Sequence, residues 1–331
     1  MAIDLRTVAI EPQRKAFDHL IRRFGDKPAS RYQEGSYDIQ AMENLHYRPT
    51  WDPEQQLYDT GITRIVLEDW HVLKDPRQFY YNTYTVTRGR QQESAETNFG
   101  LAENRGLVEA LDPVVRDAAL RILVPLRHVA WGDNQNNAFI SGYGYATPWT
   151  QACMFYAMDN LGIAQYLSRI GLLLGGVDAL AHAKAAWQDD EAWQPLRRYV
   201  EDSMAVRDPF ELFVAQNLAL DGLLYPLVYG RIVDGLLSGR GGSTVAILTQ
   251  FMSEWFAETR AWVDAVVSAA AKESDANATT LSAWVTAWQA RAVEALMPVA
   301  ATVLDDDAVA RAVSAQVEEF RLRVARAGIA G

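Results

Sequence analysis

Histidine and cysteine are scarce in this chain of 331 residues, and basic residues are fewer than acidic ones. The one cysteine, Cys153, excludes an internal disulfide framework, so we expect a cytoplasmic protein in a reducing compartment. Cys153 lies in an apolar stretch without a basic neighbour, which favours an inert buried thiol over a nucleophile. The net charge of −11 and the lack of a basic stripe argue against a nucleic-acid partner, whose phosphates would be repelled.

The sequence also shows no pattern typical of a secretory signal or of an interdomain linker. The stretch MAIDLRTVAIEPQRK has no continuous apolar segment, so we expect no leader. No Ser/Pro/Gly-rich stretch divides the chain, which favours one large helical domain at 61–331 after an N-terminal helix and extended arm at 1–60. Aromatic residues scattered over 26–59 without helical or strand periodicity lie either on the chain's own bundle or across a partner.

The strongest helical pattern runs from Thr147 to Gly175. Thr147 is a good N-cap, Pro148 suits the first helical position, and the Gly175-Gly176 pair ends a helix. The segment carries one acidic and one basic residue, and its apolar side chains point in every direction, so we expect a helix buried all round. Its polar residues interrupt the apolar run too often for a membrane span.

Further helices are expected along the chain, because no sustained period-two alternation is present. Asp-Pro pairs at 112–113 and 208–209 each combine a cap with a first-position proline, and Pro125 should kink the helix that it interrupts. We therefore predict an all-α, ferritin-like helical bundle. The expected core helices are 113–142, 148–175, 209–237 and 244–272, and the expected flanking helices or helix pairs are 13–24, 88–110, 182–206, 280–304 and 306–327.

A ferritin-like di-metal bundle takes one Glu from each of two helices and Glu-x-x-His from each of the other two. The chain contains that motif twice, as Glu43-Asn-Leu-His46 and Glu68-Asp-Trp-His71. Both copies lie among prolines and glycines, outside the charge-poor helices, and a motif with two free positions is a weak signal. A di-iron oxygenase that uses these four residues is therefore an alternative, and chance spacing is the preferred interpretation.

The position of the histidines argues against metal inside the bundle itself. No histidine follows His182, so the second helical hairpin cannot supply an imidazole. In the central helix the position three residues after Asp159 or Asn160 is Gly162 or Ile163, neither of which binds metal. We therefore expect no catalytic residue, no metal ligand and no cofactor-binding residue in this chain.

Three segments of the sequence resemble a known family. The chain is similar to the β subunit of the hydroxylase component of bacterial multicomponent monooxygenases, most of all in the phenol hydroxylase and toluene monooxygenase branch. The resemblance extends over most of the chain. Its segments are WHVLKDPRQFYYNTY (70–84), PLRHVAWGDNQNNAFISGYGYATPWTQACMFYAMDNLGIAQYLSRIG (125–171) and LDGLLYPLVYG (220–230).

The resemblance implies a ferritin-like fold and a place in an (αβγ)2 assembly. In that family the α subunit holds a carboxylate-bridged di-iron centre and hydroxylates an aromatic ring, with electrons from NADH through a separate reductase. A small regulatory protein also docks, and the β subunit is a metal-free sibling of α. Laid on the α pattern, the ligand positions fall near Ala130, Asn160, Ile163, Asp221, Glu254 and Ala257.

We therefore expect a non-catalytic structural β subunit that supports α, γ and the second αβγ protomer. The arm at 26–59 is the candidate segment for wrapping α, so removal of residues 1–59 should abolish co-purification with α. Two alternatives stay open: the di-iron oxygenase described above, and a free-standing helical protein that binds an apolar ligand inside its bundle.

Overall fold

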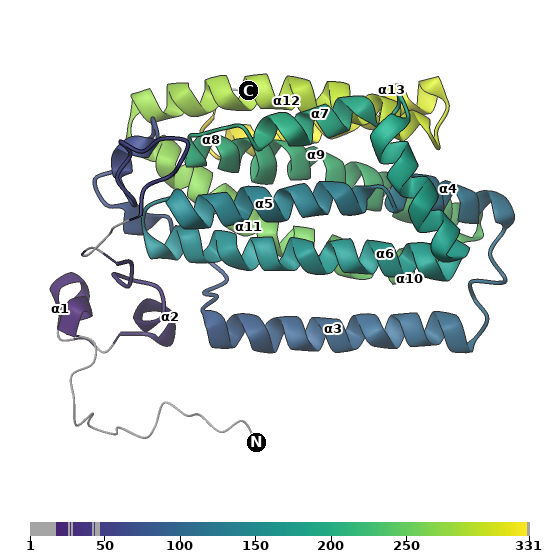
Figure 1. The fold of residues 1–331 in the computed structure, drawn as a ribbon, viewed down its shortest axis with the longest axis horizontal. Coiled ribbons are helices and arrows are strands. Elements are labelled where there is room, and N and C mark those ends of the chain that lie inside the picture. Colours follow the sequence, from purple (N-terminus) through teal and green to yellow (C-terminus); the bar gives the residue numbers. More distant parts are fainter. Residues whose placement is uncertain (1–17, 26, 28, 42, 44–46, 330–331) are drawn as a thin grey trace, which may run out of the picture.

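The computed structural model describes residues 18–25, 27, 29–41, 43 and 47–329. Within these residues all regular structure is helical and no strand occurs, so the all-α prediction is confirmed. The long helices run side by side, with α12 along one edge of the bundle and α3 along the opposite edge (Figure 1). In chain order the elements are α1 (Asp18–Phe24), α2 (Arg31–Glu34), η2 (Thr60–Ile62), η3 (Trp70–Val72), α3 (Tyr81–Asn104), α4 (Pro113–Leu123), α5 (Leu126–Tyr143), α6 (Thr147–Asp189), α7 (Gln194–Ser203), α8 (Pro209–Phe213), η4 (Val214–Leu220), α9 (Asp221–Tyr225), η5 (Pro226–Gly242), α10 (Ser243–Leu248), α11 (Gln250–Glu273), α12 (Asp275–Ala301) and α13 (Asp306–Arg326).

Most helix boundaries follow the local sequence. The Asp112 carboxylate accepts a hydrogen bond from the Val114 N–H at 2.8 Å and so caps α4. Pro125 separates α4 from α5, as expected of a residue without an N–H donor. Gly25 has a φ of +68° and ends α1, and residues 13–17 of the helix predicted there lie outside the described residues.

The N-terminus of α6 differs from the prediction. Thr147 is the first helical residue, and Ala146, with a φ of +73°, stands at the N-cap without a side-chain hydrogen bond. The prediction that Thr147 is the N-cap is therefore wrong by one residue, because Ala146 holds that position. Gly176 interrupts the helix with φ 68° and ψ −163°, as the glycine pair predicts, and a second helical segment continues to Asp189.

The prediction that α6 is buried all round is also wrong. One face of the helix leaves large apolar side chains 40 to 46% exposed, namely Met154, Met158, Leu161 and Leu172.

The helix that is buried on every side is instead the continuous run α8–η4–α9. Every residue from Pro209 to Tyr225 is buried except Glu211, which is half-buried. The longer helical stretch Pro209–Leu248 has the length and composition of a membrane span, but 94% of its most apolar window is buried within the protein. The interior of this bundle is therefore organised around α8–η4–α9, with α5 and α6 packed as an antiparallel hairpin beside it.

The N-terminal arm packs against its own bundle. The Trp51 ring lies 6.0 Å from the Phe139 ring and 5.5 Å from the Tyr143 ring at the end of α5. The Gln40 amide donates to the Gly144 carbonyl at 3.1 Å. The short helix α2 within the arm was not predicted. Of the two alternatives for this segment, the described residues favour packing on the bundle, and a contact with a partner stays a prediction.

Candidate functional site

Four of the ligand positions that the resemblance implies meet inside the bundle. Ala130 comes from α5, Asn160 and Ile163 from α6, and Asp221 from α9, and all four are buried. Together they line an internal void of about 10 Å³. One water molecule needs roughly that volume, so the void has no room for a pair of metal ions.

The side chains at these positions do not fit a di-iron centre. Ala130 and Ile163 offer only methyl groups where a carboxylate and an imidazole would be needed. The Asn160 amide donates to the Tyr156 carbonyl at 3.2 Å. Asp221 is the one carboxylate among the four positions. A ferritin-like metal centre therefore lacks its donor set here.

The register expected on α11 is wrong. Glu254 and Ala257 are exposed, and the Glu254 carboxylate accepts a hydrogen bond from Gln250 on the solvent side. The helix is interrupted at Thr249, between α10 and α11, and this interruption changes which face of α11 points inward. Trp255 is the fully buried residue, and its ring lies 4.7 Å from that of Tyr156. An indole therefore occupies the interior where the register placed a carboxylate.

A buried acid pair lies beside the void. Asp133, one turn after Ala130 on α5, and Asp221 are each 1% exposed. Burial raises the pKa of Asp133 well above its usual range, and the charge of Asp221 and the hydrogen bond between the two carboxyl groups raise it further. Burial raises the pKa of Asp221 to about 6, against hydrogen bonds from Tyr156, Asp133 and Gln216. In the hydrogen bond between the two carboxyl groups, Asp133 is therefore the proton donor and Asp221 the acceptor.

Neutral amides surround this acid pair. Asn137 donates to Asp133 at 2.6 Å and exchanges two hydrogen bonds with Asn217, at 2.9 and 2.8 Å. Asn136 donates to Gln216 at 2.9 Å, and Gln216 donates to Asp221 at 3.1 Å. The sequence reasoning missed this cluster, although the run Asn-Gln-Asn-Asn at 134–137 within an otherwise apolar helix could have indicated it. Every polar group here has a partner, which is the condition for a stable buried network.

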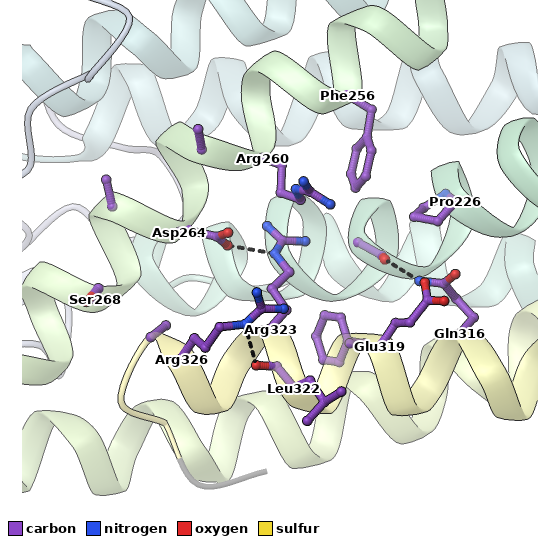
Figure 2. Close-up of a pocket in the computed structure, with 15 residues that line it drawn as sticks. Pro226, Phe256, Arg260, Asp264, Ser268, Gln316, Glu319, Leu322, Arg323 and Arg326 are labelled. Carbon is purple, nitrogen blue, oxygen red and sulfur yellow. Dashed lines mark hydrogen bonds and ion pairs between the residues drawn. The ribbon is translucent and has the colours of Figure 1, made fainter.

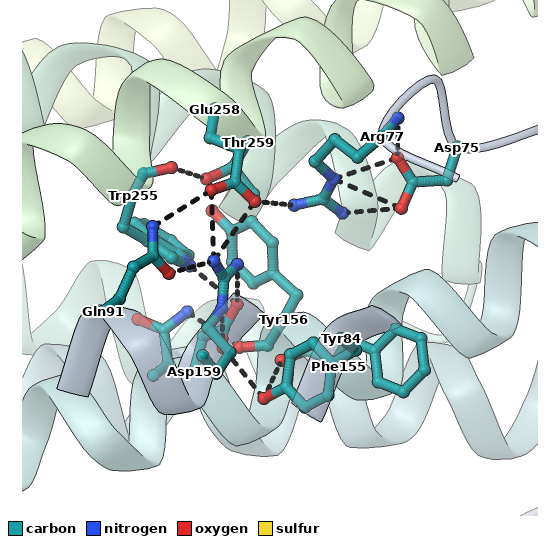
Figure 3. Close-up of polar contacts among 12 residues, drawn as sticks. Asp75, Arg77, Tyr84, Gln91, Phe155, Tyr156, Asp159, Trp255, Glu258 and Thr259 are labelled. Atoms are coloured by element: carbon teal, nitrogen blue, oxygen red, sulfur yellow. Dashed lines mark hydrogen bonds and ion pairs between the residues drawn. The ribbon is translucent and has the colours of Figure 1, made fainter. Parts of the chain in front are cut away.

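A second cluster holds a buried charge. Asp159 on α6 accepts two hydrogen bonds of 2.8 Å from Arg88 on α3, one of 2.9 Å from Tyr84 and one of 2.9 Å from the Trp255 indole (Figure 3). Burial lowers the pKa of Arg88, but Asp159 and then Glu258 raise it, and the net shift is upward. Asp159 therefore joins α6 to α3 through its ion pair with Arg88, and to α11 through the hydrogen bond from the Trp255 indole.

The same cluster extends to the loop before α3. Arg77 bonds both carboxylate oxygens of Asp75, and its Nη1 lies 3.8 Å from the Glu258 Oε1 (Figure 3). The Arg77 guanidinium also lies over the Trp262 ring, 5.0 Å from its centroid. Arg77 and Arg88 thus connect segments that are distant in the sequence. The bonds from Arg88, Tyr84 and Trp255 together occupy the lone pairs of the Asp159 carboxylate.

The two Glu-x-x-His motifs do not form a metal site among the described residues. Glu43 and Glu68 are exposed, and His46 lies outside the described residues. His71 is buried, and its ring nitrogens lie 3.1 Å from Asp38 and 3.2 Å from Asp69.

Burial is the main cause that lowers the pKa of His71. Burial likewise lowers the pKa of His128 to about 4, and that ring stacks on Trp187 at 5.6 Å. It also raises the pKa of the Cys153 thiol well above its usual range. Among the described residues no group of three or more His, Cys, Asp or Glu side chains is placed to hold a metal ion.

The topology of this helical bundle defines a class of protein, the ferritin-like helical subunits related to di-metal proteins. Its interior is closed and keeps one carboxylate, Asp221, at the expected metal-ligand positions. A family model described as Methane/Phenol/Alkene Hydroxylase matches residues 48–274. The chain belongs to this methane/phenol/alkene hydroxylase family, and the expected family resemblance is confirmed.

Individual relatives agree in name and fold. The chain is 52% identical over 302 residues to the phenol 2-monooxygenase oxygenase component DmpL of Pseudomonas sp. (strain CF600), covering 91% of each. It is 45% identical over 323 residues to the corresponding component MhpL of Acinetobacter pittii (strain PHEA-2), covering 97% of each. A crystal structure of phenol hydroxylase from Pseudomonas sp. OX1 is similar with a TM-score of 0.86 at 46% identity, covering 95% of this chain and 97% of that one.

Proposed function

We propose that this chain is the non-catalytic β subunit of a phenol hydroxylase-type oxygenase component in the cytoplasm. The single observation that carries the proposal is the closed interior, in which Ala130, Asn160 and Ile163 stand at the expected ligand positions around a void of about 10 Å³. The di-iron centre then belongs to the partner α subunit, and NADH delivers electrons through a separate reductase. The γ subunit and a second αβγ protomer complete the assembly, to which a regulatory protein docks.

An uncovered stripe on the α5–α6 hairpin supports a role in assembly. Met154, Met158 and Leu161 recur at the three- and four-residue spacing that packs one helix against another, and Leu172 follows on the same face three turns later. The antiparallel hairpin places Trp131 of α5, which is 52% exposed, level with the middle of α6. We refer to these five residues as the α5–α6 stripe. An exposed apolar row with a central tryptophan is typical of a protein interface, and it is our candidate surface for α.

The docking of α is tested by charge insertion. In the co-expressed oxygenase component, Met158→Asp combined with Leu161→Asp should abolish co-purification of this chain with α. The matched control is Val177→Asp, which lies on the same helix beyond the Gly176 break and is 75% exposed. If the double variant still co-purifies, the stripe is not the interface.

The absence of metal from this chain is tested by iron analysis of the assembled component. Asp221→Asn and His71→Gln, each in this chain, should leave the iron content per αβγ unit unchanged. A fall in iron with Asp221→Asn would place metal in the bundle, and a fall with His71→Gln would support the rival Glu-x-x-His site. The remaining alternative, a carrier of an apolar ligand inside the bundle, is disfavoured because the interior void of about 10 Å³ is far smaller than the roughly 300 Å³ that small-molecule sites usually enclose.

A further inference from the structure

A groove lies between α11 and α13. It has a volume of about 560 Å³, and Gly222 and Pro226 form its floor. Along α11 it extends from Phe256 to Ser268, which is about 18 Å at the rise of an α-helix. Figure 2 shows side chains of both helices directed into the space between them. The groove lies outside both polar clusters described above.

A buried arginine lies at the centre of this groove. Arg323 of α13 reaches toward α11, where its Nε donates to Asp264 at 2.6 Å (Figure 2). The residue is 8% exposed, and neither of its two Nη atoms has a hydrogen-bond partner. A buried guanidinium with unpaired donors is costly, because the donors lose their water without a replacement acceptor. The two Nη groups therefore call for an acceptor that the chain does not supply.

The surroundings add positive charge and apolar walls. Arg260 and Arg326 also line the groove, and the charge of Arg260 is one of the causes that lower the pKa of Arg323, after burial. Of the two acidic residues in the lining, Asp264 is bonded to Arg323, and Glu319 is paired with Arg231 on its outer side. Three arginines in one groove are notable in a chain of net charge −11.

The apolar part of the lining lies beside the guanidinium. Phe256 from α11, Phe320 from α13 and Pro226 contribute apolar side chains to the lining of the groove. Gly222 permits the close approach of the floor, because a Cβ at that position would lie 2.7 Å from the Arg323 Nη1 and 3.0 Å from the Phe320 ring. The site thus offers two parallel N–H donors next to an apolar wall.

We propose that this groove binds a small organic carboxylate with an aromatic or aliphatic body. The carboxylate accepts two hydrogen bonds from the Arg323 Nη groups, since a planar guanidinium matches that geometry. Arg260 and Arg326 add electrostatic attraction, and the body of the ligand lies against Phe256 and Phe320. The volume falls within the usual range for small-molecule sites. This site is formed by the chain alone and does not depend on the supporting-subunit role.

Benzoate is the probe, and binding is measured by titration calorimetry on the assembled oxygenase component. We expect benzoate to bind more tightly than inorganic phosphate, which lacks the apolar body, and than benzyl alcohol, which lacks the charge. Arg323→Met should weaken benzoate binding by about tenfold or more, as expected from the loss of charge-assisted hydrogen bonds. The matched control is Arg321→Met, an exposed position on the same helix, which should leave the affinity unchanged.

The position of the ligand is checked independently with 4-bromobenzoate soaked into crystals. The anomalous signal of bromine should appear between Phe256 and Phe320 and should vanish in Arg323→Met. Arg260→Gln, an exposed substitution, should weaken binding in the same direction and serves if Arg323→Met does not fold.

Three results would overturn the proposal. Equal affinity for phosphate and benzoate would contradict an organic ligand. A bromine signal that persists in Arg323→Met, or that lies elsewhere, would contradict the site. No binding at all, as when a neighbouring subunit fills the groove, would contradict a small-molecule ligand.

Discussion

Asp133 and Asp159 lie on neighbouring helices of one bundle, and the protein neutralises these two buried carboxyl groups in opposite ways. Asp159 keeps its charge and pairs with Arg88, Tyr84 and the Trp255 indole. The pKa of Asp133 is raised by burial and by the nearby Asp221, to which it donates a hydrogen bond. In a di-metal bundle the metal cations balance the interior carboxylates. Here an arginine is the counter-ion on one side of the interior, and two carboxyl groups share a hydrogen bond on the other.

The ion-paired side should be the more sensitive to substitution. Arg88→Met leaves the Asp159 carboxylate buried without its counter-ion, which should lower the free energy of unfolding by about 3–5 kcal/mol. Urea unfolding of the full-length chain or of the assembled component measures this. Arg90→Met, an exposed position on the same helix, should change the value by less than about 0.5 kcal/mol. A cost below about 1 kcal/mol for Arg88→Met would contradict a charged Asp159.

On the proton-sharing side, Asp133→Asn should stabilise the protein at neutral pH. An asparagine amide can accept from Asn137 and donate to Asp221, as the protonated acid does. The pKa of Asp133 is raised on folding, so its stabilising contribution is complete at low pH and is lost as the pH rises toward the raised value. Asp133→Asn has no ionisable group at this position, so its stability does not fall in this way as the pH rises.

The unfolding free energies of the two proteins should therefore be similar near pH 4 and diverge at higher pH. We expect the stability difference to grow with pH by no more than about 1.4 kcal/mol per pH unit, with the variant the more stable protein at neutral pH. Urea unfolding at several pH values provides the measurement. Parallel curves for variant and wild type would show that Asp133 is ionised in the folded protein.

Replacing Trp255 weakens the contact that joins α11 to the charged cluster. Trp255→Phe removes the indole N–H that donates to Asp159 and leaves a small cavity beside Tyr156, so we expect a loss of about 2 kcal/mol. Thermal unfolding measures the effect. If the same substitution costs as much in an Asp159→Ala background, which has no acceptor for the indole, the loss arises from the cavity and not from the hydrogen bond.

The outer carboxylate of the charged cluster should matter least. Glu258 is about a quarter exposed at its side chain, and solvent screens its pairing with Arg88. Glu258→Gln keeps an acceptor for Arg88 and should cost no more than about 1 kcal/mol in urea unfolding. A loss as large as that of Arg88→Met would mean that Glu258, and not Asp159, is the main partner of the arginine.

Local patterns in the sequence were sufficient for much of the fold. Asp112 before Pro113 and Asp208 before Pro209 begin helices because cap and proline act within one turn. The distribution of histidines along the sequence indicated a bundle without imidazoles in its second half. These features depend on nearest neighbours along the chain, so they can be inferred without knowledge of packing.

The rotation of each helix about its own axis could not be inferred from these local patterns. In α6 an apolar residue occurs at nearly every angle, so periodicity could not reveal that Met158 and Leu161 face outward. In α11 the interruption at Thr249 determines the inward face. The register estimated from the sequence placed Glu254 at the inward position, which Trp255 occupies in the structure. The α11–α13 groove also escaped prediction, because Arg323 lies in the last turn of its helix, where basic residues are common without any binding role.

By itself, therefore, the sequence determined the helical class, the positions of most caps and breaks, and the supply of potential ligands in each half of the bundle. Only the tertiary structure decided that Arg88 meets Asp159, that Asp133 shares a proton with Asp221, and which apolar row of α6 remains uncovered. The physical reason is that caps and helix breaks arise from hydrogen bonds within a few residues. Pairing and burial instead depend on how helices cross and rotate, which is set by close packing of the whole interior.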